Sequence, residues 1–506
     1  MARTVHRAVV AGGGLLLLAT TLTAQGYQLR LDSRFSSVSY RGYSAQTIPA
    51  ADVVTQPDGR LTTPDGITVR CPAGATTCTY VEPGAELTGS PLVSTVDAAV
   101  WGFGVSGLKL RTKARVGADL QDPDVWPGQA PAVQLLEGYV EYANRLVTVQ
   151  AGRTYEFSRL GFTGVDGGKL DLRPFGGHLR LSAYGGWGLA RGAPLPLSSP
   201  EVNPLNQFQP DDRQLVAGGS LGWAFSGFEG RVLYQREVDP RGDLETILAS
   251  ERGAIDAALR PMRGVTLAGG AEYDLARGEL GTADARLTLA ARSGRAQLSL
   301  GGKHYRPYFD LWTIWGVFDP APYTGGFGSA RITPIAGVEL WTRGEFFSYD
   351  DTAADTVLVK VADDGWRWSF GATIARLRSW TFDAGYHVDK GPGASSLGFD
   401  GRVMFHPGDV FFLSTDAGYL SRPLEFRFND TKLFHLGFRA GLEPRPGVRI
   451  HAGGRYYDEV RERADAAELD WNQFRIDFGL TLTFRSGAET PSIHPAILRI
   501  PERGEQ

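Results

Sequence analysis

Residues 474–484 read Phe474-Arg475-Ile476-Asp477-Phe478-Gly479-Leu480-Thr481-Leu482-Thr483-Phe484, and this segment decides the fold. Every even-numbered residue in it is large and apolar, whereas every odd-numbered residue is polar or glycine. Successive side chains of a β-strand point to opposite faces, so the pattern predicts a strand with one apolar and one polar face. Soluble sheets alternate in the same way, and the rest of the chain has to separate the two cases.

The N-terminal segment has the composition of a secretory signal peptide. Two early arginines, Arg3 and Arg7, precede an apolar run at residues 8–20, and small residues lie near Ala24. We therefore expect residues 1–24 to be a signal peptide that is cleaved near Ala24. No cysteine follows the apolar run, which argues against a lipid anchor. The sequence thus predicts export across the inner membrane.

Beyond the signal, the chain has no run of about 18 or more uncharged apolar residues, so no helix is expected to cross a bilayer. The remaining spanning form is a closed β-barrel, in which every backbone polar group is paired. Alternating segments recur along the whole chain and predict about 22 strands, in a range of about 16 to 22. These segments are 26–43, 92–104, 107–121, 132–144, 146–156, 165–173, 177–190, 212–226, 228–239, 243–259, 263–275, 280–293, 295–306, 326–334, 336–350, 365–376, 378–390, 395–406, 409–420, 431–442, 447–460 and 469–484.

The connections between these segments alternate in length. Outer-membrane barrels join their strands by short periplasmic turns and longer outer loops. Here alternate connections are short and turn-like, as in Ser106-Gly107 and Ser293-Gly294. The others are mostly long: 44–91, 121–131, 190–211, 307–325, 351–364, 421–430 and 461–468. A soluble sandwich has no reason to sort its loops in this way, so we predict an all-β fold, a transmembrane antiparallel up-and-down β-barrel within residues 25–484.

The exported start, the series of hairpins and the aromatic end of the last strand together resemble the porin-like outer-membrane barrels of Gram-negative bacteria. The resemblance implies an outer-membrane location and an insertion signal read by the outer-membrane insertion machinery, formed by Phe474, Ile476, Phe478, Leu480, Leu482 and Phe484. Most porins stop at the final aromatic residue, whereas this chain continues from Arg485 to Gln506. We expect this tail, residues 485–506, to remain in the periplasm.

The period of two also assigns a face to each side chain. Charged residues of both signs fall opposite the apolar residues, which predicts a polar lumen wall. The predicted lumen-lining residues are Asp284, Arg286, Lys303, Glu339, Arg343, Glu345, Arg367, Asp383, His387, Asp400, Arg402, Asp416, His435, Arg439, Arg449, Arg455, Arg475 and Asp477. Opposed rows of charge either select solutes through a transverse field or simply pair across strands as the wet lining of the wall.

The chain has two cysteines, Cys71 and Cys78, within the Pro- and Gly-containing segment 44–91. In an exported chain, this spacing favours a local disulfide with a structural role. A metal pair is the alternative, but no histidine lies nearby to complete a zinc site. We therefore expect a long outer loop that contains a disulfide.

Segment 305–327 is too rich in aromatic residues for a solvent-exposed loop. One hypothesis is an inward-folded constriction or a stacking platform for sugars or other amphipathic solutes. The alternative is a loop packed on the barrel rim or against segment 44–91. The residues proposed for a constriction or a ligand site are Tyr308, Phe309, Trp312, Trp315, Phe318 and Tyr323.

No motif in the sequence predicts catalysis. Residues 102–107 match the letters GxGxxG, but an alternating strand pattern follows them instead of a helix. The histidines are not paired with a recognisable nucleophile motif, and we predict no catalytic residue, no metal site and no cofactor. A formal net charge of −4 argues against a nucleic-acid-binding protein.

The resemblance implies a porin-like channel for passive diffusion of small hydrophilic solutes, with outer-membrane lipid and the insertion machinery as partners. The alternative is a closed structural or ligand-binding barrel that recognises extracellular material through segments 44–91 and 305–327. A barrel of about 22 strands usually needs a plug, and we expect these two segments to fill part of the opening. The solute and the ion preference stay open, as does assembly into a homo-oligomer.

Overall fold

The computed structural model describes residues 26–57, 59, 61–72, 74–121, 133–189, 214–239, 247–306, 322–350, 364–391, 394–408, 410–421, 431–461 and 470–486. Within these ranges, no helix has the length and apolarity needed to cross a membrane. The helical elements found in them are two short 3-10 helices, η1 (Ala50–Asp52) and η2 (Phe175–Gly177). The five predicted loop residues Tyr308, Phe309, Trp312, Trp315 and Phe318 lie outside the described residues, as do the signal peptide and most of the C-terminal tail.

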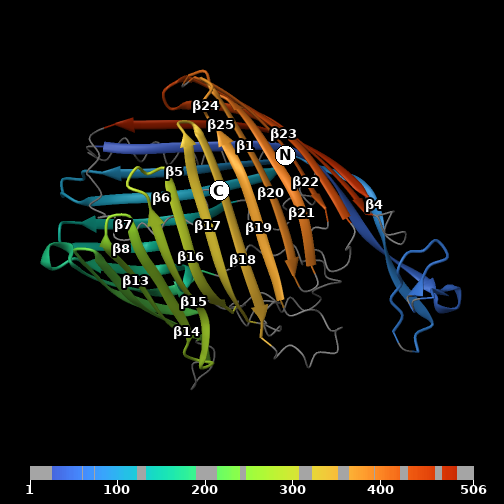
Figure 1. Cartoon of the computed structure of the whole chain (residues 1–506), viewed down its shortest axis with the longest axis horizontal. Helices are drawn as coiled ribbons and strands as arrows, with labels where there is room; N and C mark the ends of the chain where they lie inside the picture. Colours follow the sequence, from blue (N-terminus) through green and yellow to red (C-terminus); the bar gives the residue numbers. More distant parts are fainter. Residues whose placement is uncertain are drawn as a thin grey trace.

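In the described part of the chain, 22 strands form one closed antiparallel barrel, which confirms the predicted fold class and strand number (Figure 1). The first eleven are β1 (Gly26–Pro49), β5 (Pro91–Trp101), β6 (Leu108–Asp119), β7 (Val133–Ala143), β8 (Val147–Ser158), β9 (Gly161–Leu172), β10 (Leu179–Gly188), β11 (Leu215–Phe225), β12 (Phe228–Asp239), β13 (Ile247–Met262) and β14 (Val265–Asp274). The others are β15 (Glu279–Ala290), β16 (Ala296–Tyr305), β17 (Tyr323–Ile335), β18 (Val338–Tyr349), β19 (Asp364–Ile374), β20 (Trp380–Gly391), β21 (Ala394–Phe405), β22 (Phe411–Ser421), β23 (Thr431–Arg445), β24 (Val448–Arg461) and β25 (Trp471–Ser486).

The barrel closes between the first and the last strand of the sheet. β1 pairs with β25 from Tyr27, opposite Ser486, to Val38, opposite Arg475. On its other edge, the same part of β1 pairs with β5, with Phe35 opposite Leu92. Both edges of this part of β1 therefore pair with a neighbouring strand, so its backbone polar groups have hydrogen-bond partners, as a membrane-spanning strand requires.

The two faces of the wall differ as the alternation predicts. Apolar side chains such as Leu436 and Phe478 point outward and are 46% and 52% exposed in the isolated chain. Polar side chains on the opposite parity, such as Gln235, Glu272 and Glu345, are buried. An exposed apolar band around a barrel with a polar interior is the arrangement that lipid stabilises.

Rings on the inner face lie flat over glycines of the neighbouring strand. A Cβ atom added at Gly479 would lie 2.0 Å from the ring of His451, and one at Gly418 would lie 2.3 Å from the ring of His435. The glycines of these strands therefore provide room for inner rings, and a larger residue would displace them.

β1 continues beyond the barrel, which changes the expected role of segment 44–91. From Val38 to Pro49, β1 pairs with β4 (Thr77–Gly89), and the two strands extend past the barrel as a ribbon at the right of Figure 1. The short strands β2 (Val54–Thr55) and β3 (Leu61–Thr62) pair with each other beside it. Cys71 and Cys78 form a disulfide in this ribbon, with their Cα atoms 4.4 Å apart. The segment is thus largely ordered β structure that extends away from the opening, rather than a loop that fills it.

The described short turns gather at one end of the barrel, which we call the short-turn end. Examples are the turns between β11 and β12, between β13 and β14, and between β17 and β18. The opposite end, which we call the loop end, also has a tight turn, because β8 and β9 are joined by Arg159 and Leu160 alone. The sequence patterns end β8 at residue 156 and begin β9 at residue 165, so the structure lengthens both strands.

Candidate functional site

The lumen is the candidate functional site. All predicted lumen-lining residues lie on the strand parity opposite the exposed apolar side chains, along strands from β15 to β25. Several of them take part in ion pairs across strands. Asp416 of β22 lies 3.1 Å from Arg455 of β24 and 3.5 Å from His435 of β23, and Asp477 of β25 lies 3.6 Å from Arg34 of β1.

A second group of ion pairs links β16 to β20. The Lys303 ammonium lies 2.7 Å from Glu345, and the Arg367 guanidinium lies 2.9 Å from Asp389. Arg367 also lies 4.0 Å from Glu345, so the four side chains form one chain of alternating charge. Mutual pairing of this kind lowers the cost of holding charges in a partly desolvated wall.

The end of the β8–β9 hairpin leaves the wall. β7 pairs with β8 only as far as Arg153, and β10 pairs with β9 only as far as Val165. Residues 154–164, which we call the hairpin tip, are therefore paired within the hairpin and lie beyond both neighbouring ladders, apart from one hydrogen bond of 2.9 Å that the Leu189 N–H donates to the Gly164 carbonyl oxygen.

The hairpin tip contacts strands that are not its neighbours in the sheet. Arg159 lies 2.5 Å from Asp256 of β13 and 2.8 Å from Asp284 of β15. Leu160 is buried in a cluster with Leu233 of β12 and Ala254 of β13. Contacts that skip several strands are possible only across the lumen, so the tip lies inside the barrel.

Polar contacts hold the sides of the hairpin tip as well. Thr163 donates a hydrogen bond to the Gln235 side chain of β12 over 2.9 Å, and both side chains are buried. Arg231 of β12 donates to Glu156 over 2.9 Å. The tip is thus fixed to the inner wall at its turn and along both strands.

A row of glycines lies at the base of the hairpin tip. Gly167 of β9 is in register with Gly152 of β8 and with Gly186 of β10. Gly152 has a φ of 130°, which favours glycine, and a Cβ atom at Gly167 would lie 2.0 Å from the Gly185 carbonyl oxygen. Close backbone approach at this row allows the hairpin to bend away from the sheet.

The inner face of β6 carries a basic residue at each alternate position: Lys109, Arg111, Lys113 and Arg115. Arg111 lies 3.2 Å from Asp97 of β5 and 3.0 Å from Glu137 of β7. The strand therefore presents a row of cations that neighbouring carboxylates partly neutralise. The alternation of residues 108–115 contains this signal, but the sequence analysis did not assign these side chains to the lumen.

Of the aromatic segment 305–327, the structure describes both ends. Tyr305 ends β16 and Tyr323 begins β17, and their rings face the lumen with centroids 5.4 Å apart. Phe347 and Tyr349 of β18 lie beside them, at 5.6 Å and 5.5 Å from Tyr323. Tyr323 was predicted from the sequence, whereas the two β18 rings were not, because they are distant in sequence and share only the inner parity.

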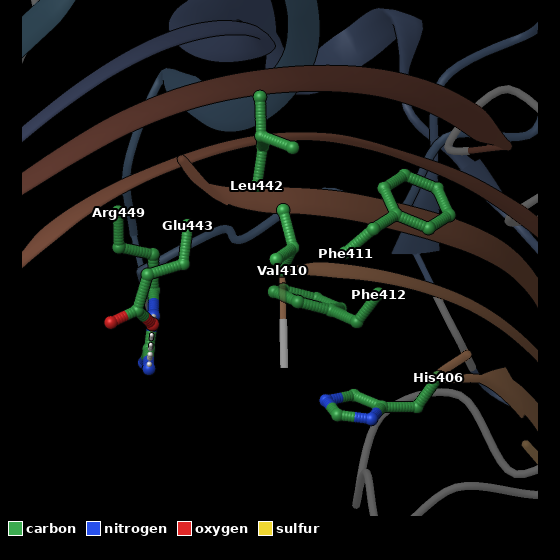
Figure 2. Close-up of a pocket in the computed structure, with 7 residues that line it drawn as sticks. All are labelled: His406, Val410, Phe411, Phe412, Leu442, Glu443 and Arg449. Carbon is green, nitrogen blue, oxygen red and sulfur yellow. Dashed lines mark hydrogen bonds and ion pairs between the residues drawn. The ribbon is translucent and has the colours of Figure 1, made fainter. Parts of the chain in front are cut away.

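A small cavity of about 230 Å³ lies at the short-turn end (Figure 2). It is lined by His406, Val410, Phe411, Phe412, Leu442, Glu443 and Arg449. Figure 2 shows the side chains of Glu443 and Arg449 pointing toward each other, and they form an ion pair of 3.0 Å. The cavity is smaller than the roughly 300 Å³ at which ligand pockets begin, and we assign no ligand to it.

The closed wall of 22 strands in the described residues, its apolar outer band and its polar lumen define the chain as an antiparallel up-and-down β-barrel of the transmembrane class. No family model matches the sequence, and no curated protein matches it either. Among solved structures, the chain is similar to a point mutant of the ferric enterobactin receptor PfeA of Pseudomonas aeruginosa in complex with enterobactin. That match has a TM-score of 0.51 and 9% identity, and it covers 90% of this chain and 81% of the receptor chain.

Two porins also match. The BenF-like porin of Pseudomonas fluorescens Pf-5 has a TM-score of 0.40 and 11% identity, over 91% of this chain and 99% of the porin chain. Pseudomonas aeruginosa OpdK with vanillate has a TM-score of 0.40 and 11% identity, over 90% of this chain and 99% of that chain. At these identities, the receptor match supports the barrel fold and nothing finer.

Proposed function

We propose that the protein is an outer-membrane channel through which small hydrophilic solutes diffuse passively, with the hairpin tip as its constriction. The observation that carries the proposal is the inward position of Arg159 and Leu160 against a charged inner wall. A barrel of this size is wide enough to hold an aqueous lumen, and an inserted hairpin narrows it.

The charges on the wall support small hydrophilic solutes as the cargo. A wall of ion pairs, such as Lys303 with Glu345 and Arg455 with Asp416, favours contact with water and polar solutes over contact with apolar ones. From β16 to β24 cations and carboxylates alternate, whereas β6 presents a row of one sign of charge, which neighbouring carboxylates partly neutralise. We therefore expect weak ion selectivity.

A closed structural or ligand-binding barrel is the second candidate. It is favoured by the depth of burial of inner polar residues near the hairpin tip, where Gln235 is 1% exposed and Thr163 is 3% exposed. That part of the lumen is therefore filled by side chains. In the channel candidate, solutes would have to pass along the opposite wall.

Single-channel conductance of the refolded chain in a planar bilayer tests the proposal. We expect steady conductance from the wild type. In Arg159→Ala, Asp256 and Asp284 lose their shared cation, so the hairpin tip is released and the conductance becomes larger and noisier. Loss of one partner of a partly buried ion pair costs up to about 3–5 kcal/mol, which is enough to move a hairpin.

Arg260→Ala is the matched control, because it removes an ion pair of 2.8 Å with Glu229 at the short-turn end, and Arg260 is not one of the predicted lumen-lining residues. Its conductance should equal that of the wild type. If wild type and Arg159→Ala are both silent, the channel is excluded and the closed barrel remains. If both conduct equally, the hairpin tip is not the constriction.

A further inference from the structure

Four inner rings form one surface at the loop end of the lumen. Tyr305 and Tyr323 are cross-strand partners, and Tyr323 is also the partner of Tyr349. The ring centroids of Phe347 and Tyr349 are 5.8 Å apart, and Tyr323 contacts both. We call Tyr305, Tyr323, Phe347 and Tyr349 the ring platform.

The rings are tilted to one another, by 47° between Tyr305 and Tyr323 and by 61° between Tyr323 and Tyr349, and glycines on the adjacent strands leave room for Phe347 against the wall. Phe347 is 5% exposed, and a Cβ atom at Gly365 of β19 would lie 2.4 Å from its ring. On the other side, a Cβ atom at Gly325 of β17 would lie 3.1 Å from the Phe347 Cβ atom. Phe347 is therefore the base of the platform, whereas Tyr305 is 37% exposed and the other tyrosines are half-buried.

Two ion pairs border the platform. Lys303 pairs with Glu345 at 2.7 Å, and Arg367 pairs with Asp389 at 2.9 Å. These two cations and two carboxylates balance each other. A charged ligand would have to displace one of these partners, whereas a neutral ligand with several hydroxyl groups can donate to the carboxylates and accept from the cations.

The same cations cover part of the ring faces. The Lys303 ammonium lies 5.1 Å from the Tyr323 ring centroid, and the Arg367 guanidinium lies 4.8 Å from that of Phe347. The rings and the ion pairs thus share one compact surface, in which apolar faces lie directly beside polar groups. A sugar ring has the same two components, an apolar C–H face and a rim of hydroxyls.

We infer that the ring platform is a carbohydrate-binding site at the loop end of the lumen. This inference rests on the channel function proposed above. The C–H face of the sugar stacks on the tyrosine rings. Its hydroxyls bond to the Lys303–Glu345 and Arg367–Asp389 pairs. A linear oligosaccharide fits better than a single sugar, because Tyr305, Tyr323 and Tyr349 lie side by side across three strands.

Block of the ion current by maltohexaose, added to the loop-end side of a planar bilayer, tests the inference. We expect Tyr323→Ala to weaken the block by about tenfold, which is the loss of one aromatic contact. Tyr323→Phe should keep the block within about threefold, because the ring stays in place. Tyr457→Ala is the matched control, since Tyr457 is an inner tyrosine of β24 that also lies beside a cation, Arg455, at 6.0 Å but outside the platform.

Three outcomes contradict the inference while leaving the channel intact. The wild type could conduct without being blocked by maltohexaose, or Tyr323→Ala and Tyr457→Ala could weaken the block equally. The third outcome is that benzoate blocks the current and maltohexaose does not. If the wild type does not conduct, calorimetry of maltohexaose with the detergent-solubilised barrel replaces the current. Binding that Tyr323→Ala weakens would then uphold the site without the channel, and no binding would overturn it.

Discussion

Gly270 shows how one missing side chain positions another. It lies in register between Asp256 and Asp284, the two carboxylates that hold Arg159. A Cβ atom at Gly270 would lie 2.3 Å from the Ile255 carbonyl oxygen and 2.6 Å from both the Arg159 Nη2 atom and the Asp256 Oδ1 atom, so an added methyl group would strain the backbone as well as the ion pair. The guanidinium can reach both carboxylates because the residue between them has no side chain.

Gly270→Ala should therefore displace Arg159 and reproduce the larger, noisier conductance expected for Arg159→Ala. Gly222→Ala is the control, because the nearest atom to a Cβ there is 3.7 Å away. Single-channel recordings of both variants check this prediction. Equal conductance in Gly270→Ala and wild type would show that the tip tolerates the methyl group. The ion pairs of Arg159 with Asp256 and Asp284 would then not be what holds the tip in place.

At the scale of the strand, orientation follows from a period of two. β23 sends Leu436 outward, 46% exposed, and the adjacent His435 inward beside Asp416. Leu436→Arg should reduce the free energy of unfolding in lipid by about 2–4 kcal/mol, since a cation near the membrane midplane is poorly solvated. His435→Arg places a cation beside Asp416 in the lumen, where it is solvated and paired, and should cost less than about 1 kcal/mol.

Urea titrations of the two variants in phospholipid vesicles measure both changes. If they are equally destabilised, or if His435→Arg is the worse of the two, the assignment of faces in β23 is wrong.

The same periodicity explains which elements the sequence predicts. Segment 395–406 predicts β21 (Ala394–Phe405) because Leu397, Phe399, Val403 and Phe405 share one parity. β4 was missed because Pro83 and Gly84 interrupt its pattern. The hairpin tip was missed for another reason: Arg159 and Asp256 are 97 residues apart, and no local pattern indicates that they meet. Local alternation thus predicts the wall, whereas the site depends on contacts across the lumen.

At the scale of the whole molecule, the ribbon of β1 and β4 is separate from the barrel. The barrel seam uses β1 only from Gly26 to Val38, and β4 pairs with the remainder. Replacement of Cys71 and Cys78 by serine should therefore leave conductance unchanged. Loss of the disulfide should destabilise the ribbon by about 2–3 kcal/mol, because its small closed loop is no longer constrained in the unfolded state.

Limited proteolysis of vesicles that contain the double variant should cut within residues 44–91 faster than in wild type. The rest of the barrel should stay protected in both. A change in conductance would contradict the separation of ribbon and barrel.

The pairing of β1 with β25 also constrains the order of assembly. Thr481 donates a hydrogen bond to Asp32 over 2.7 Å across a sequence separation of 449 residues. Such a high contact order makes closure slow, and until closure the first strand has one edge without a partner. One edge of β1, the first strand to be exported, therefore stays without a partner until β25 has been exported. An incomplete chain retains an open sheet edge, so a truncation within β25 should appear as aggregation during biogenesis rather than as a smaller pore.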